Sequence, residues 1–253
     1  MFPKEHGAYG QLLFPLITAL AVARPGAAAF ALAGAAVLGF LAHEPLLVLL
    51  GQRGTRASRE DGRRAARWFA MFAIAAGGLA AISIPTMPRV AQHAVGFVTV
   101  LAAALLVVIA LRREHTTGGE IYSAFTLASL ALPVALASGA THAVALTCVL
   151  SFAAAFTSAT VCVRAVIMYT RHPPAVVARA TGIATTVLAV TVLAVLSATG
   201  VAVAAAPWAP LPVCIAAVVI AIKPPSARQL RSVGWTLVAT TAATAGILIA
   251  GLR

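Results

Sequence analysis

The chain alternates between long apolar runs and short polar breaks. A bilayer-crossing helix needs about 20 mostly apolar residues, and a sliding window of that size separates such runs from their flanks. The runs here are unbroken and rich in Ala, Leu and Val, whereas strands of a membrane barrel would alternate polar and apolar positions. The pattern predicts nine transmembrane helices, at residues 9–23, 27–50, 67–84, 91–111, 120–138, 142–170, 180–199, 201–222 and 233–251.

The breaks between the runs carry residues that end helices. Arg-Pro-Gly at 24–26 is a turn sequence, and Pro-Pro at 173–174 and at 224–225 stops the preceding helix. Gly200 is the weakest of the breaks. The predicted fold class is therefore all-α: one polytopic transmembrane helical domain over residues 1–253, with the helices in a single bundle.

Composition supports the bilayer as the natural solvent. Of 253 residues, 61% are hydrophobic and only 9% are charged, and the mean hydropathy is +0.99. A soluble domain carries about 25% charged residues, so this chain has too few to cover a water-exposed surface. Three cysteines, Cys148, Cys162 and Cys214, lie inside apolar runs without metal-site spacing, which favours small core residues.

The net charge of +12 indicates orientation rather than nucleic-acid binding. Lys and Arg accumulate in the cytoplasmic loops of membrane proteins. With the N-terminus inside, fifteen of the 18 basic residues fall on cytoplasmic segments, and only Arg24, Arg89 and Arg253 fall outside. The sequence thus predicts an N-terminus inside, a C-terminus outside, the lipid bilayer as the main partner and no nucleic acid.

One acid is embedded within the second predicted helix. Sixteen residues of that helix precede His43 and Glu44, and Pro45 follows them, where it removes a backbone hydrogen bond. A charge at membrane depth costs about 2.5–3.5 kcal/mol on insertion scales, so such a residue usually faces the bundle interior and has a partner. Two interpretations stay open: an ion pair with a nearby arginine that locks two helices, or a functional pocket.

Two further charged residues lie near the predicted cytoplasmic side of the bundle. Glu120 opens the fifth predicted helix, where a helix dipole favours an acid, and Ser123 and Thr126 follow on the same face. Arg164 shares one face of the sixth helix with Thr160, near its inner end. Arg164 either snorkels to the interface or faces inward toward an anion or Glu44.

These residues predict a polar cluster at the cytoplasmic mouth of the bundle. The candidate catalytic residues are His43, Glu44 and Glu120. The candidates for binding a substrate or anion are Lys4, His6, Arg53, Arg56, Arg164, Arg171 and His172. The candidate ligands for a divalent metal such as magnesium are Glu5, Glu44 and Glu120. Arginine holds phosphate through paired hydrogen bonds, and carboxylates are preferred ligands of hard cations.

Four short motifs together resemble the YwiC-like family of bacterial integral membrane proteins. They are Pro3-Lys4-Glu5-His6-Gly7-Ala8, His43-Glu44-Pro45, Gly119-Glu120 and Val163-Arg164. The resemblance runs over most of the chain, and its most specific part is the N-terminal Lys-Glu-His-Gly-Ala. It implies a multi-pass protein of the bacterial cytoplasmic (inner) membrane, of a family without a settled biochemical activity.

The predicted architecture is also similar to the UbiA-type intramembrane prenyltransferases. In that superfamily, cytoplasmic segments after the second and sixth helices carry aspartate-rich motifs that hold magnesium and an isoprenoid diphosphate. This chain departs from that pattern, because Asp61 is its single aspartate and the segments 51–66 and 164–179 are rich in arginine instead. The resemblance would imply a lipid phosphate held directly by arginines.

The functional expectation is a cytoplasm-facing site for an anionic or isoprenoid, phosphate-bearing lipid. Whether the protein is an enzyme, such as a UbiA-like transferase without the aspartate motifs, stays open. The alternatives are a small-molecule or proton-coupled transporter and a non-catalytic assembly partner. Proton-coupled transporters usually carry ionisable groups near the midplane, whereas the polar groups here lie near one face. The sequence does not indicate the substrate or the oligomeric state.

Overall fold

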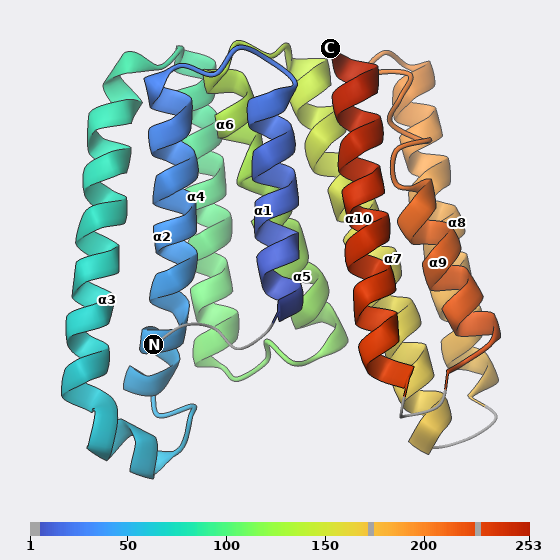
Figure 1. The fold of residues 1–253 in the computed structure, drawn as a ribbon, viewed down its shortest axis with the longest axis horizontal. Coiled ribbons are helices and arrows are strands. Elements are labelled where there is room, and N and C mark those ends of the chain that lie inside the picture. Colours follow the sequence, from blue (N-terminus) through green and yellow to red (C-terminus); the bar gives the residue numbers. More distant parts are fainter. Residues whose placement is uncertain (1–5, 172–174, 226–228) are drawn as a thin grey trace.

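A computed structural model describes residues 6–171, 175–225 and 229–253 as an all-α bundle (Figure 1). These residues form ten α-helices and one short 3-10 helix, η1 (Ile84–Thr86). The α-helices are α1 (His6–Ala21), α2 (Ala27–Leu49), α3 (Thr55–Ser83), α4 (Arg89–Ala110), α5 (Thr117–Ser129), α6 (Ala131–Ala137), α7 (His142–Arg171), α8 (Val176–Ala198), α9 (Leu211–Ile222) and α10 (Leu230–Leu252).

Seven of the described helical segments are long and apolar enough to cross a membrane. They are Ala27–Leu49, Ser58–Thr86, Arg89–Ala110, Thr117–Ala137, His142–Thr170, Val176–Ala198 and Arg231–Leu252, while α1 and α9 are shorter apolar helices. The segment Thr117–Ala137 contains both α5 and α6. Pro133 has no N–H to donate to Ser129, which accounts for the interruption between the two helices. The protein is therefore a multi-pass helical membrane protein.

The predicted helix at 201–222 begins only at Leu211 in the structure. Residues 199–210 are as apolar as the neighbouring transmembrane helices, yet they form turns, because Pro207 and Pro210 lie among them. Side chains of α7 satisfy the irregular backbone: Val203 N–H donates to Thr147 Oγ1 at 2.9 Å, and Ser151 Oγ donates to the Ala206 carbonyl at 3.3 Å. Non-helical backbone at membrane depth needs such partners from the protein.

The arginine-rich stretch expected as a loop before residue 67 is instead part of α3, which begins at Thr55. Arg, Ala and Glu are strong helix formers, and charged pairs four residues apart add to helix stability. Arg56 Nε donates to Glu60 Oε1 at 2.8 Å in this arrangement. α3 therefore extends past the apolar run at the end where the loop after α2 lies (Figure 1).

α7 is the central helix of the described bundle. It packs against α1, α5, α6, α8, α9 and α10, and Phe152 is fully buried within it. Cys148, Cys162 and Cys214 are all buried, as the sequence predicts. A Cβ atom added at Gly182 of α8 would lie 3.2 Å from the Cys162 sulfur, so α7 and α8 approach closely.

The opposite side of the bundle is more open. α2 packs mainly against α3, and α4 packs against α5 and α6. Although α3 and α4 follow each other in the chain, they make almost no contact along their described lengths. α3 consequently lies at the outer edge of the molecule (Figure 1), and a space remains between the α2–α3 pair and α4.

Candidate functional site

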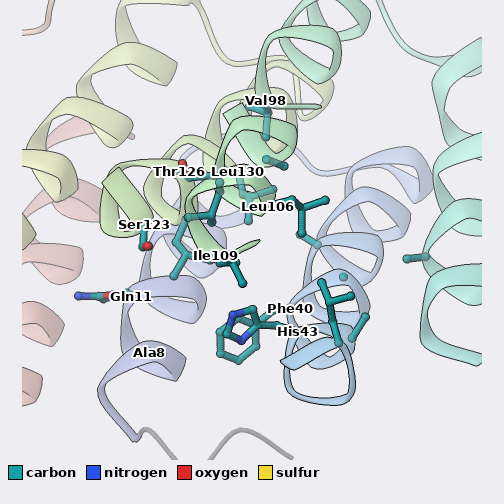
Figure 2. A pocket seen from close by; sticks show the side chains of 18 of the residues that line it. Ala8, Gln11, Phe40, His43, Val98, Leu106, Ile109, Ser123, Thr126 and Leu130 are labelled. Atoms are coloured by element: carbon teal, nitrogen blue, oxygen red, sulfur yellow. The ribbon is translucent and has the colours of Figure 1, made fainter. Parts of the chain in front are cut away.

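A pocket of ≈ 870 Å³ fills this space and is lined by residues from α1 to α7 (Figure 2). Its volume falls within the range of about 300–1,000 Å³ that is typical of small-molecule sites. Along α2 the lining runs from Leu32 to Leu47. Fifteen positions at 1.5 Å each correspond to roughly 22 Å, so the pocket is elongated along the helix axes.

Most of the pocket wall is apolar and is built from small side chains where the helices face it. The Gly and Ala lining residues of α2, α3 and α4 are Ala35, Ala36, Gly39, Ala42, Ala76, Gly77, Ala80 and Ala102. A Cβ atom added at Gly39 or at Gly77 would meet nothing within 4 Å. Larger residues of α4, among them Val98, Leu106 and Ile109, form the facing wall (Figure 2). The small side chains at these positions of α2 and α3 therefore leave room between the helices.

The ionisable lining residues gather at one end of the pocket. They come from the end of α2, the segment that follows it, the segment between α4 and α5, and the start of α5. These residues are His43, Glu44, Arg53, Glu114, His115 and Glu120. Figure 2 shows His43 beside Phe40, with Gln11 of α1 and Ser123 of α5 near the same end. Sequence reasoning anticipated His43, Glu44, Arg53 and Glu120 at this place.

Glu44 forms a bidentate ion pair with Arg53. Arg53 Nε donates to Glu44 Oε1 at 2.8 Å, and Nη2 donates to Oε2 at 2.6 Å. The left-handed conformation of Gly51 (φ 69°) ends α2 and turns the chain back, which allows Arg53 to reach a residue nine positions earlier. Paired hydrogen bonds of this kind are among the stronger polar interactions. The embedded acid thus has an arginine partner from the segment directly after its own helix.

α4 ends in a turn at Arg112, whose φ of 57° is left-handed. Arg113 N–H donates to the Val108 carbonyl at 3.0 Å, which is the pattern of a helix C-cap. Thr116 Oγ1 then accepts from Gly119 N–H at 3.1 Å and caps α5. A Cβ atom at Gly119 would overlap the Arg113 carbonyl and lie 2.9 Å from Glu114 Cα. Only glycine allows this segment to pack onto α5, and the packing positions Glu114 and His115.

Arg164 joins α7 to the start of α5. Arg164 Nε donates to Glu120 Oε2 at 2.7 Å, and Arg164 Nη2 donates to the His115 carbonyl oxygen. Of the interpretations left open by the sequence, Arg164 faces inward, but its carboxylate partner is Glu120 rather than Glu44. One guanidinium therefore ties both α5 and the preceding segment to the central helix.

Glu114 is an acidic lining residue that pairs with no arginine among the described side chains. Its side chain is only 15% exposed, and the imidazole nitrogen His115 Nε2 lies 3.7 Å from Glu114 Oε1. Glu114 Oε2 is buried and has no hydrogen-bond partner within the described part of the chain. Sequence reasoning missed Glu114 and His115, because it interpreted the segment's charges as topology signals. An acid within a basic segment, just before Gly118-Gly119, was the signal that could have identified them.

The remaining predicted residues are distributed as follows. Ser123 and Thr126, predicted to form a polar stripe with Glu120, line the pocket, and so does Thr160, predicted to share a face with Arg164. Arg56 does not line it: its side chain is 88% exposed and pairs with Glu60. Lys4, Glu5 and His172, and the side chains of His6 and Arg171, lie outside the described residues. Gly7 and Ala8, which directly follow His6, do line the pocket.

The predicted metal site is incomplete in the part of the chain that the structure describes. Within that part, no group of three or more His, Cys, Asp or Glu residues could hold a metal ion. Glu44 and Glu120 are each paired with an arginine, and the third candidate ligand, Glu5, is not described. Magnesium binding and the catalytic roles of His43, Glu44 and Glu120 stay predictions.

Comparison with known proteins identifies the family. A family model described as "YwiC-like protein" matches residues 2–136, which is more than half of the chain. The chain belongs to the YwiC-like family. Neither the curated proteins nor the solved structures contain a match, so the architectural resemblance to UbiA-type enzymes gains no support. The YwiC-like segment covers α1 to α6 and contains every lining residue of the pocket except Thr160.

Proposed function

We propose that this YwiC-like protein binds a lipid-like amphiphile with one flexible tail, such as an isoprenoid or a single acyl chain. The observation that carries the proposal is the division of the pocket into a long apolar part and one ionisable end. The tail would lie along α2, α3 and α4, and the head group would lie beside His43 and Glu44. Small hydrophilic ligands would leave most of this apolar wall uncovered.

The dimensions of the pocket support a ligand of this shape. Its length along α2, roughly 22 Å by helix rise, is a large part of the ~30 Å hydrocarbon core of a bilayer. Its hydroxyl groups at mid-depth are already used within their own helices: Thr99 Oγ1 donates to the Val95 carbonyl and Thr126 Oγ1 to the Tyr122 carbonyl, at 2.8 and 2.9 Å. These two threonines at mid-depth therefore have no free hydroxyl hydrogen to offer a ligand, and most of the wall around them is apolar.

The orientation proposed for the protein places the head group at the cytoplasmic side. The ionisable end of the pocket lies where the segments after α2 and α4 lie, and these segments carry arginines. By the positive-inside rule that end faces the cytoplasm. The proposal thus comprises nine crossings, with α1 and α9 as short ones, an N-terminus inside, and residence in the bacterial cytoplasmic membrane.

A photoreactive probe tests this proposal. The protein is reconstituted in phosphatidylcholine nanodiscs and labelled with a farnesol analogue that carries a diazirine in its tail, and the labelled peptides are mapped. Gly77→Leu places bulk in the pocket, whereas Gly78→Leu places the same bulk on the neighbouring exposed position that does not line it; a Cβ atom meets nothing within 4 Å at either.

We expect labelling of α2–α4 peptides that falls at least fivefold in Gly77→Leu and changes less than twofold in Gly78→Leu. Equal labelling of the two variants, or labels mapped only to α8 and α10, would refute a tail-binding pocket. The transporter and assembly-partner alternatives stay predictions, and flux measurements in proteoliposomes would address the first.

A further inference from the structure

Among the residues that the structure describes, the ionisable end of the pocket holds more negative than positive fixed charge. Its lining contains three carboxylates, Glu44, Glu114 and Glu120, and the only arginine among the described lining residues is Arg53. Arg164 of α7 approaches Glu120 from beside the pocket. Apart from the two histidines, the described part of this end therefore places three carboxylates near two guanidinium groups.

Both guanidinium groups are engaged by carboxylates. Arg53 contacts both oxygens of Glu44, and Arg164 contacts Glu120 and the His115 carbonyl. A phosphate would have to displace a carboxylate from one of them and would then lie near the acid that it released. Charge interactions are stronger in a partly dehydrated pocket than in water, so this repulsion weighs against an anionic head group.

Glu114 is the third carboxylate, with which neither Arg53 nor Arg164 pairs. It lines the pocket, its buried Oε2 has no hydrogen-bond partner among the described residues, and His115 Nε2 is 3.7 Å from its Oε1. A carboxylate removed from water without a partner is costly, and a cation beside it offsets that cost. Phe40, one turn before His43, adds an aromatic ring at the same end, and such rings attract cations.

We infer that the head group of the bound amphiphile carries a positively charged nitrogen, such as the ammonium group of a long-chain amine, beside Glu114. This inference rests on the proposed function, because it needs the tail to lie in the pocket. The head group is decisive for affinity, since a tail in lipid is already in apolar surroundings and gains little by moving into an apolar pocket. An ammonium group would donate hydrogen bonds to carboxylate oxygens and balance the excess charge.

Three competitors with one tail test the inference: farnesylamine, farnesol and farnesyl phosphate. Each competes with the photoreactive farnesol probe for the protein in phosphatidylcholine nanodiscs at pH 8, where an ordinary imidazole is neutral and an ordinary amine is charged. Membrane partition of each competitor is measured in empty nanodiscs, and affinities are compared per molecule in the lipid. We expect the amine to compete at least tenfold better than farnesol and the phosphate to compete worse than farnesol.

Glu114→Gln should reduce the advantage of the amine at least fivefold. Glu60→Gln removes the same charge from the exposed pair on α3 and should leave that advantage unchanged. If Glu114→Gln does not fold, the order in which the three competitors bind the unaltered protein still shows whether a cationic head group is preferred. A phosphate that competes best, or three equal competitors, would overturn the inference while the tail site stands. Failure of all three, with no difference between Gly77→Leu and Gly78→Leu, would instead overturn the proposed function.

Discussion

α7 and α3 are nearly the same length, 30 and 29 residues, and both contain a long apolar stretch, yet their surroundings differ completely. In α7, 67% of the apolar stretch is buried in the protein, against 11% in α3. Lipid tails are as apolar as a protein core, so hydropathy does not distinguish the two positions. What separates them is the set of neighbours: α7 is enclosed by six helices, while α3 has one main partner and borders the pocket.

Small residues serve opposite purposes in the two regions. At Gly182, against α7, an added Cβ would meet the Cys162 sulfur at 3.2 Å, so the missing side chain allows close packing. At Gly77 of α3 an added Cβ would meet nothing within 4 Å, so the missing side chain leaves room. A count of Gly and Ala therefore cannot distinguish a tight interface from a cavity.

The largest expected contrast comes from removing one phenylalanine ring from each helix. Phe152→Ala in α7 opens a new cavity in a fully buried site and should lower the free energy of unfolding by about 3 kcal/mol. Phe69→Ala in α3 only enlarges the existing pocket and should cost less than about 1 kcal/mol. Thermal unfolding in detergent, followed by tryptophan fluorescence, measures both. Equal losses would mean that the two helices are packed alike.

A smaller contrast is expected at the two adjacent glycines that begin α5. Gly119→Ala forces a methyl group against the Arg113 carbonyl and should cost about 2 kcal/mol, in the range of overpacked sites. Gly118→Ala meets nothing within 4 Å and should be neutral or slightly stabilising, because alanine favours a helix. The same unfolding assay applies. If Gly119→Ala is tolerated as well, the segment carrying Glu114 is not held as the structure shows.

The smallest contrast concerns two arginine–glutamate pairs of similar length. Arg164→Gln breaks the 2.7 Å contact with Glu120 that joins α5 to α7, and should cost about 1 kcal/mol, because both side chains are partly exposed. Arg56→Gln breaks the 2.8 Å pair with Glu60, which is largely exposed, and should change stability by less than about 0.5 kcal/mol. Chemical unfolding at two salt concentrations measures both. A larger loss in Arg56→Gln would show that the pair between helices contributes nothing special.

The helices were predictable from the sequence because each apolar run is long and most are ended by Pro, Gly or Arg. The exceptions have local causes: prolines keep 201–210 out of a helix, and helix-forming residues extend α3 through the arginine-rich stretch. In the site, Glu44 was identifiable as an acid inside an apolar run. Its pairing was not, and neither was that of Glu120 with Arg164, since a contact across 44 positions depends on how α5 and α7 pack.

Because α3 and α4 make little contact, the proposed ligand would reach the pocket from the lipid, and its affinity is then expressed relative to its concentration in the membrane. A tail that enters between these helices comes from the surrounding lipid and returns to it without crossing water. Occupancy of the pocket then follows the mole fraction of ligand in the membrane. Diluting a proteoliposome sample with buffer should leave occupancy unchanged, whereas fusing the vesicles with ligand-free lipid should empty the pocket.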